Sequence, residues 1–271
     1  MQFDFGHTAK AYLGGAEALF NIRGFIRDDG LVHPLDTDSK VLATLFEVVV
    51  KAKLQQLADD HGFVLECPSE QNYYPDFTLS RTRADGSIER LAVDVKTTYM
   101  NSSRDAVKFT LGSYTGCIHP DRETKNILYP YSSYAEHWVV GFVYQRAQPA
   151  RNALYSAAEL DQVPLPFSSV NLFIQEKWRI AGDKPGSGNT NNIGSLEGPL
   201  HLFESGRSLF SSDAEFLAYW RNFNPSGAQR TYSNLAEFQA WCRNNQNPPV
   251  PLEVVAAAKQ APMQMGLFGP A

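Results

Sequence analysis

The sequence predicts an α/β protein in which helices flank a central mixed β-sheet. The segments 77–80 and 88–95 are short, rich in apolar residues and separated by a turn signal, so they predict a β-hairpin. The segment 39–60 has the apolar face of a long helix. Buried strands are expected at 137–146 and 170–174. Strands mixed with helices in this way are typical of the α/β class.

The composition is that of a globular protein with a substantial core. The chain has 271 residues, of which 43% are hydrophobic and 12% aromatic, which suits one large domain or two small ones. The net charge of -5 argues against non-specific coating of nucleic acid. It allows a DNA enzyme, because local basic clusters decide binding and a metal site needs carboxylates.

The cysteines and the N-terminus exclude several other classes. Cys67, Cys117 and Cys242 are far apart and form no Cys-x-x-Cys pair, so the sequence suggests neither a zinc ribbon nor a disulfide framework. No segment is long and apolar enough to span a membrane. The N-terminus lacks a basic region followed by an apolar one, as a secretory signal would have. We therefore expect a cytoplasmic protein.

The helix at 39–60 carries one acidic residue of interest. Asp38 or Ser39 can cap its start, and Gly62 follows its end. Glu47 lies in the middle of the apolar run. It is either a boundary residue that points to solvent or a third carboxylate directed toward the acidic residues of the hairpin. The pattern alone leaves both interpretations open.

The hairpin carries a candidate metal site. Asp76 stands at the start of its first strand, and alternation of side chains places Asp94 and Lys96 on one face of the second. The apolar neighbours face the other way: Leu91, Val93 and Val95. Two carboxylates form an oxygen-rich site suited to Mg²⁺, and a lysine beside them can stabilise charge on a phosphate or help to activate water. The alternative is an ordinary edge strand with surface charges.

Two further groups of residues can contact a substrate. The polar loop 67–74, which includes Gln71 and Asn72, leads directly into Asp76 and is either a substrate loop or a plain connector. Hydroxyls and cations that can bind phosphates follow the second strand: Thr97, Thr98, Arg104, Lys108, Arg122 and Lys125. The alternative for each cation is a solvated basic face.

The segment 181–195 is rich in glycine, asparagine and threonine. It is not a Walker loop, since no Gly-Lys-Ser/Thr follows, and its low apolar content predicts that it lies outside the core. Its asparagine and threonine side chains can contact base edges, and its glycines let the backbone approach bases closely. The alternative is a flexible loop. The candidate contact residues are Gly186, Ser187, Gly188, Asn189, Thr190 and Asn192.

The C-terminal part divides into two helices and a tail. Apolar periodicity predicts helices at 213–222 and 233–243. From residue 244 onward the composition changes to asparagine, proline and alanine, which predicts a flexible tail at 244–271. We therefore expect a folded domain at 1–243.

Eight separate blocks together resemble the EcoRV family of type II restriction endonucleases, in the same order along the chain. The blocks are 74–79, 94–99, 108–112, 137–138, 177–178, 186–190, 192–195 and 219–222. The resemblance covers roughly residues 22–243. It implies a restriction-endonuclease-like fold with the Pro-Asp…Asp-x-Lys site of a large nuclease superfamily, and a domain at 1–243 that includes the dimerisation and DNA-recognition loops.

The resemblance also implies an activity and a set of roles. A homodimer would bind double-stranded DNA at the palindrome GATATC and cut it centrally, to blunt ends, with Mg²⁺ as the cofactor. Asp76 and Asp94 look like metal ligands and Lys96 like the catalytic lysine, and the match of Glu47 to an acidic helix residue favours its active-site interpretation. The DNA-binding positions would be Lys40, Gln71, Asn72, Thr97, Thr98, Lys125, Gly186, Ser187, Gly188, Asn189, Thr190 and Asn192.

Some positions depart from the family pattern, and two other functions stay open. Tyr73, Asn191 and Ala43 differ from the residues that the family has there, and Asn191 bears on the preference for flanking sequence. One alternative is a repair or nicking nuclease, for which the recognition loop would have no reason to match. The other is a non-catalytic DNA-binding relative, which would lack Asp94 or Lys96.

The tail contains a peptide that resembles a docking motif for the bacterial replication sliding clamp. The residues are Gln264, Met265, Gly266, Leu267 and Phe268. A disordered tail can offer such apolar side chains to a groove without disturbing the fold. The alternative is a chance match in a biased segment.

Overall fold

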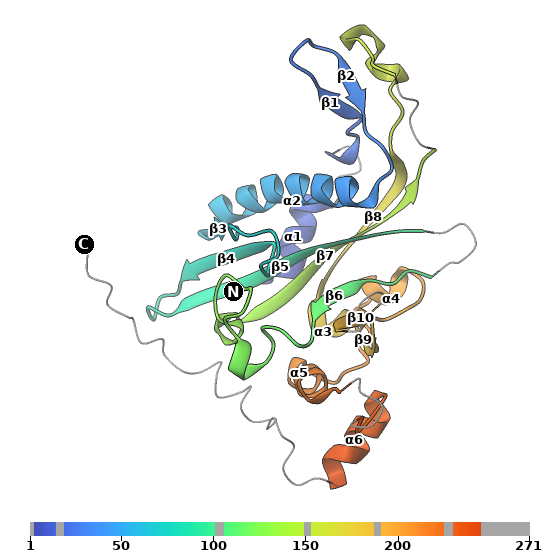
Figure 1. The fold of residues 1–271 in the computed structure, drawn as a ribbon. Helices are drawn as coiled ribbons and strands as arrows, with labels where there is room; N and C mark the ends of the chain where they lie inside the picture. The colour runs from blue at the N-terminus through green and yellow to red at the C-terminus, as the bar shows by residue number, and fades with distance from the viewer. Residues whose placement is uncertain are drawn as a thin grey trace.

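The computed structural model describes residues 3–14, 19–100, 106–148, 153–186, 191–224 and 230–244. Its largest sheet has five strands in the order β3-β4-β5-β7-β8 (Figure 1). The strands are β3 (Val64–Glu66), β4 (Phe77–Thr82), β5 (Ile88–Tyr99), β7 (Glu136–Arg146) and β8 (Phe167–Glu176). β5 and β7 run parallel and the other neighbours antiparallel. The predicted α/β fold with a mixed sheet is confirmed.

The predicted hairpin is β4 and β5, and both strands are longer than the apolar pattern indicated. Phe77 pairs with Val93 and Leu79 with Leu91. Asp85 shapes the turn by accepting a hydrogen bond from the backbone N–H of Ser87, at 2.9 Å. β5 continues to Tyr99 because its second half pairs with β7. The strand that carries Asp94 and Lys96 therefore lies in the interior of the sheet, with a partner on each side.

Helices α1 (Phe5–Leu13) and α2 (Ser39–His61) cover one face of this sheet (Figure 1). Asp38 caps α2 by accepting hydrogen bonds from the first backbone N–H groups. Gly62 ends it with φ +69°, a left-handed conformation that favours glycine. The buried face of α2 packs on the sheet through Phe46, whose ring stacks on Phe142 of β7 at 4.6 Å. The predicted helix and both of its ends are confirmed.

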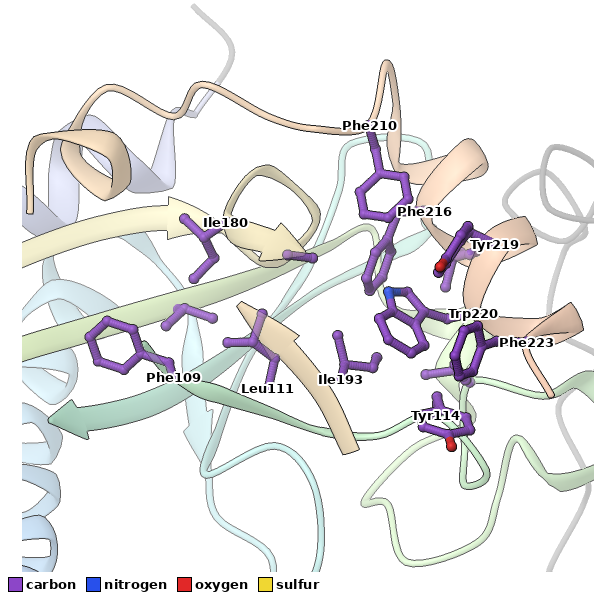
Figure 2. Packing of buried hydrophobic residues seen from close by; sticks show 14 of the residues in the cluster. Phe109, Leu111, Tyr114, Ile180, Ile193, Phe210, Phe216, Tyr219, Trp220 and Phe223 are labelled. Carbon is purple, nitrogen blue, oxygen red and sulfur yellow. The ribbon is translucent and has the colours of Figure 1, made fainter. Parts of the chain in front are cut away.

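The opposite face of the sheet carries a second layer. It contains a three-stranded sheet in the order β6 (Thr110–Ser113), β10 (Asn192–Ser195), β9 (Ala181–Pro185). The helices of this part are α3 (Lys177–Ile180), α4 (His201–Glu204), α5 (Asp213–Asn222) and α6 (Leu235–Asn244). Figure 2 shows the aromatic residues of α5 packed beside Ile193 of β10 and Leu111 of β6. This cluster joins the small sheet to the large one through Ala92 and Val139.

The small sheet corrects one prediction. The segment 181–195 was expected to lie outside the core, but Ala181 and Ile193 are fully buried. Each end of the segment forms a strand, because β10 pairs with β9 on one side and with β6 on the other. Short strands rich in glycine and polar residues show no apolar periodicity, so the sequence pattern did not reveal them.

The remaining short elements complete the description. A small hairpin is formed by β1 (Gly24–Ile26) and β2 (Val32–Pro34). The 3-10 turns are η2 (Pro120–Arg122), η3 (Tyr131–Ser133) and η4 (Ala157–Gln162). Among the residues that the structure describes, no helix has the length and apolar character needed to cross a membrane. The predicted tail lies outside the described residues from 245 onward.

Candidate active site

The hairpin brings Asp76, Asp94 and Lys96 together. Asp76 immediately precedes β4, and its Oδ2 accepts a hydrogen bond from the backbone N–H of Val95 at 2.6 Å. The two carboxylates are therefore held on adjacent strands, within one residue of the same level. Lys96 Nζ lies 2.6 Å from Asp94 Oδ2, so the ammonium and the carboxylate form a direct ion pair. This is the arrangement that side-chain alternation along β5 predicted.

Burial makes this group of charges electrostatically strained. Asp94 is 5% exposed. Burial, and then the nearby charge of Asp94, raise the pKa of Asp76 to about 8. Burial lowers the pKa of Lys96, but Asp94 and Asp76 outweigh it and the net pKa is raised. A bound cation would reduce the repulsion between the two carboxylates and allow both to ionise.

Glu47 lies close enough to join the electrostatics of this group. Its side chain is half-buried on α2, and its pKa is raised, first by burial and then by Asp94, while Lys96 opposes the shift. The part of the chain that the structure describes contains no group of three or more His, Cys, Asp or Glu side chains arranged to hold a metal ion. Glu47 therefore faces the pair of aspartates without forming a closed triad with them.

The donor set fits a hard divalent cation that keeps open positions. Asp76 and Asp94 offer carboxylate oxygens, which are the ligands that Mg²⁺ prefers. An incomplete set of protein ligands also suits Mg²⁺, because it usually keeps several waters and takes further ligands from substrate phosphates. The position of Asp76 supports this fit, because burial and then the charge of Asp94 raise its pKa and a bound cation would stabilise its ionised form.

The residues expected to contact DNA are spread over five places. Lys40 is exposed in the first turn of α2, and Gln71 and Asn72 are exposed in the turn before Tyr74. Thr97 and Thr98 continue β5 beyond Lys96, half-buried. Lys125 is exposed after η2, Gly186 and Asn192 bracket the β9–β10 connection, and Ser187, Gly188, Asn189 and Thr190 lie outside the described residues.

The two ends of the β9–β10 connection are closed by a hydrogen bond. The backbone N–H of Gly186 donates to the carbonyl oxygen of Asn192 at 2.7 Å. A Cβ at Gly186 would lie 3.2 Å from Thr110 Oγ1, so the close packing against β6 favours glycine there. The two ends of the predicted base-reading segment, Gly186 and Asn192, are therefore held next to each other at the edge of the small sheet.

A family model described as restriction endonuclease EcoRV matches residues 16–243. The chain belongs to the EcoRV family of restriction endonucleases. The type II restriction enzyme EcoRV of Escherichia coli is 41% identical over 226 residues, which cover 82% of this chain and 91% of that enzyme. The resemblance inferred from the eight sequence blocks is confirmed.

The NlaIV restriction endonuclease is a structural neighbour at 15% identity and a TM-score of 0.44, covering 93% of this chain and 95% of the other. At that score the likeness adds no weight to the assignment. Membership of the EcoRV family makes the chain a type II site-specific deoxyribonuclease, a hydrolase that acts on double-stranded DNA. Enzymes of this family generally depend on a divalent metal ion.

This EcoRV-family chain anchors its β9–β10 hairpin through residues that the sequence did not single out. Asp183 Oδ2 accepts a hydrogen bond from the N–H of Leu235 at 3.0 Å. Lys184 Nζ donates to the carbonyl oxygen of Ser233 at 2.6 Å. Tyr219 Oη donates to the carbonyl oxygen of Asp183 at 2.7 Å. These partners are distant in sequence, so no local pattern could have paired them.

A second group contains residues from the matching sequence blocks to which the sequence analysis gave no individual role. Tyr74 Oη lies 2.8 Å from His137 Nδ1, and the rings of Tyr131 and His137 stack at 4.0 Å. Tyr74 stands two residues before Asp76, so this contact fixes the path of the chain into the site. Lys177 is also buried here, and its Nζ lies 4.5 Å from the centre of the Tyr74 ring.

In the metal-free enzyme, the stability that depends on Asp76 is expected to fall as the pH rises. An aspartate in an unfolded chain titrates near pH 3.9, and the folded pKa is about 8. Between these values the folded state holds a proton that the unfolded state has released. The free energy of unfolding therefore decreases with pH across this window and levels off above it. Thermal unfolding in chelator at pH 5, 7 and 9 measures the slope.

Asp76→Asn is expected to reduce that slope, because its amide carries no titrating proton. Asp121→Asn changes a carboxyl whose side chain is 68% exposed and should keep the wild-type slope. An unchanged slope in Asp76→Asn would show that Asp76 is ionised throughout in the folded protein.

Proposed function

We propose that the enzyme cuts both strands of double-stranded DNA at GATATC, in the centre of the site, and leaves blunt ends in a Mg²⁺-dependent reaction. The observation that carries this proposal is the ion pair of Lys96 with Asp94 at 2.6 Å, beside Asp76. The 41% identity to EcoRV and the residues at 186–192 support the choice of site.

The residues of the hairpin have distinct roles in this proposal. Asp76 and Asp94 hold Mg²⁺, and Glu47 adds a third carboxylate from α2. The bound ion supplies Lewis-acid polarisation of the scissile phosphate and lowers the pKa of water. Lys96 stabilises the negative charge that develops on the phosphate oxygens during in-line attack. Its ion pair with Asp94 keeps the ammonium in position before DNA arrives.

The DNA-reading residues follow from the same proposal. Gly186, Ser187, Gly188, Asn189, Thr190 and Asn192 read base edges in the major groove, and Gln71 and Asn72 approach the minor groove and backbone. Lys40, Thr97, Thr98 and Lys125 contact phosphates. A central TA step kinks easily, so bending of the DNA adds to specificity.

The enzyme acts as a homodimer, because a two-fold protein presents one reading loop and one cleavage site to each half of a palindrome. Large apolar side chains that remain exposed support this: Phe25 and Ile26 of β1, which are 56% and 81% exposed, together with Leu154 and Leu160. The bridge between Val32 and Tyr155 brings the two segments together, so these exposed apolar side chains belong to neighbouring parts of the fold.

The domain division and the tail remain predictions. The proposed division places the endonuclease domain at 1–243, and the chemistry does not need residues 244–271, which lie outside the described residues except for Asn244 at the end of α6. The contact of Gln264–Phe268 with the sliding clamp concerns residues outside the described ones. Because the substrate is double-stranded DNA, which a restriction enzyme meets inside the cell, the proposal includes a cytoplasmic location.

Digestion of a plasmid with one GATATC site is expected to give one linear product with blunt ends. The reaction should require Mg²⁺ and stop with chelator, because the carboxylates alone cannot polarise the phosphate. Sequencing of the ends measures both the site and the stagger, and a plasmid with the site changed to GATTTC is the control. Nicked circles only would indicate a nicking or repair nuclease, and binding without cleavage a non-catalytic relative.

Asn189→Ala is expected to weaken discrimination of GATATC from sites altered by one base. Loss of a paired base-edge contact costs about 1–3 kcal/mol in each half-site. The ratio of cleavage rates on cognate and altered duplexes measures the effect. Asn191→Ala changes a neighbouring exposed asparagine with no assigned base contact and should leave this ratio unchanged. An unchanged ratio in Asn189→Ala would remove Asn189 from the reading set.

A further inference from the structure

A second lysine lies buried beneath the cleavage site. Lys177 begins α3 directly after β8 and is 3% exposed. Its Nζ lies 4.5 Å from the centre of the Tyr74 ring and 3.8 Å from the position of a Cβ at Gly112. The ammonium therefore occupies the interior between the segment that leads to Asp76 and strand β6. A buried cation of this kind needs a compensating charge.

Asp94 is the charge that compensates it. Asp94 pairs with Val139 of β7, Val139 pairs with Gln175 of β8, and Lys177 lies two residues beyond Gln175. Burial lowers the pKa of Lys177, and Asp94 is the strongest of the charges that raise it. The charge of Asp213 also raises the pKa of Lys177, but less than the charge of Asp94 does.

The charges around the cleavage site then nearly cancel. Asp76, Asp94 and Glu47 carry three negative charges when ionised, and the two lysines carry two positive ones. For these five side chains the net charge is therefore -1 when all are ionised. A divalent cation that approaches the free enzyme meets only weak attraction, whereas a bound DNA phosphate adds negative charge to the same place.

We propose that Lys177 is a positioning residue that acts as the internal counter-ion of Asp94 and keeps the free enzyme's affinity for divalent cations low, so that metal and DNA phosphate enter together. The inference depends on the proposed roles of Asp76 and Asp94 as metal ligands. It gives Lys177 a function distinct from Lys96, because Lys177 is enclosed and cannot reach the scissile phosphate. The coupling between metal and DNA is reciprocal, so DNA binding must also tighten when metal is present.

Lys177→Met tests the proposal, because methionine keeps an unbranched apolar chain and removes the charge. We expect Mn²⁺ to bind the DNA-free variant roughly tenfold more tightly than the wild type, since a repulsive charge beside the ligands is gone. Isothermal titration calorimetry with Mn²⁺ measures this. A cognate duplex whose scissile linkage is chemically blocked against hydrolysis should strengthen Mn²⁺ binding less in the variant than in the wild type.

Two matched variants separate charge from packing. Lys51→Met removes an exposed lysine of α2 and should bind Mn²⁺ as the wild type does. Lys177→Arg keeps the positive charge and should bind Mn²⁺ as weakly as the wild type does. If Lys177→Met does not fold by circular dichroism, Lys177→Gln takes its place. Unchanged or weaker Mn²⁺ binding in the folded neutral variant overturns the inference, because a purely structural lysine could only disturb the site when removed.

The same titration distinguishes this inference from the proposed function. If Asp94→Ala abolishes Mn²⁺ binding while Lys177→Met leaves it unchanged, the metal ligands stand and only the role of Lys177 fails. If Asp94→Ala leaves Mn²⁺ binding intact, Asp94 is not a metal ligand, and the proposed function fails together with the role of Lys177 that depends on it.

Discussion

Asp94→Ala is expected to lower the rate of DNA cleavage by more than about a thousandfold while leaving specific DNA binding measurable. Asp94 is buried on the interior strand β5 and pairs with Lys96 at 2.6 Å. Its removal takes away a proposed metal ligand and the partner of the proposed catalytic lysine in one step. The assigned base contacts lie elsewhere, on the β9–β10 connection, so they should survive.

Two measurements check this expectation together. Single-turnover cleavage of a GATATC duplex gives the rate, and a gel shift of the same duplex in Ca²⁺ gives binding. Asp85→Ala, at the exposed turn of the same hairpin, is the control and should cleave at close to the wild-type rate. Loss of binding in a folded Asp94→Ala protein would mean that Asp94 serves DNA recognition as well as chemistry.

Lys96→Met is expected to reduce cleavage by about a hundred- to a thousandfold, the usual loss when a group that stabilises transition-state charge is removed. The side chain of Lys96 is 25% exposed, whereas Lys177 is 3% exposed, so Lys96 is the more accessible of the two lysines. Methionine keeps the length of the chain and removes only the charge. The two aspartates remain, so divalent-cation binding should persist.

The rate at saturating Mg²⁺ measures the effect of Lys96→Met, and Lys51→Met provides the exposed-lysine control. If higher Mg²⁺ concentrations restored the wild-type rate, Lys96 would act through metal affinity and not through the transition state. A rate within threefold of wild type at all concentrations would remove Lys96 from the catalytic group.

The local parts of the fold were predictable from sequence, and so was the proximity of Asp76, Asp94 and Lys96 in the candidate site. β4 and β5 are adjacent in the chain, and the two-residue period of a strand determines that Asp94 and Lys96 share a face. Asp38 caps the start of α2, and Gly62, in a left-handed conformation, ends it. Both effects also act within a few residues along the chain. Each of these features depends on neighbours in the sequence, so a pattern could reveal it.

The features that the sequence missed all depend on distant partners. Ile193 is buried because β10 pairs with β6, which lies some eighty residues earlier in the chain. Lys177 is buried through packing against Tyr74 and Gly112, and nothing in its own neighbourhood marks it as internal. The register between distant strands is decided by tertiary packing. Sequence patterns therefore found the carboxylates but not the second cation beneath them.

The hydrogen bond from Gly186 to Asn192 has a consequence for how such enzymes diversify. It closes the intervening residues into a segment with a fixed entrance and exit, while Asp183 and Lys184 fasten the outer strand to the region of α6. These attachments are made by Gly186, Asn192, Asp183 and Lys184 themselves. Under the proposed function, substitutions between Gly186 and Asn192 change which bases are read and leave the proposed catalytic residues on β5 in place.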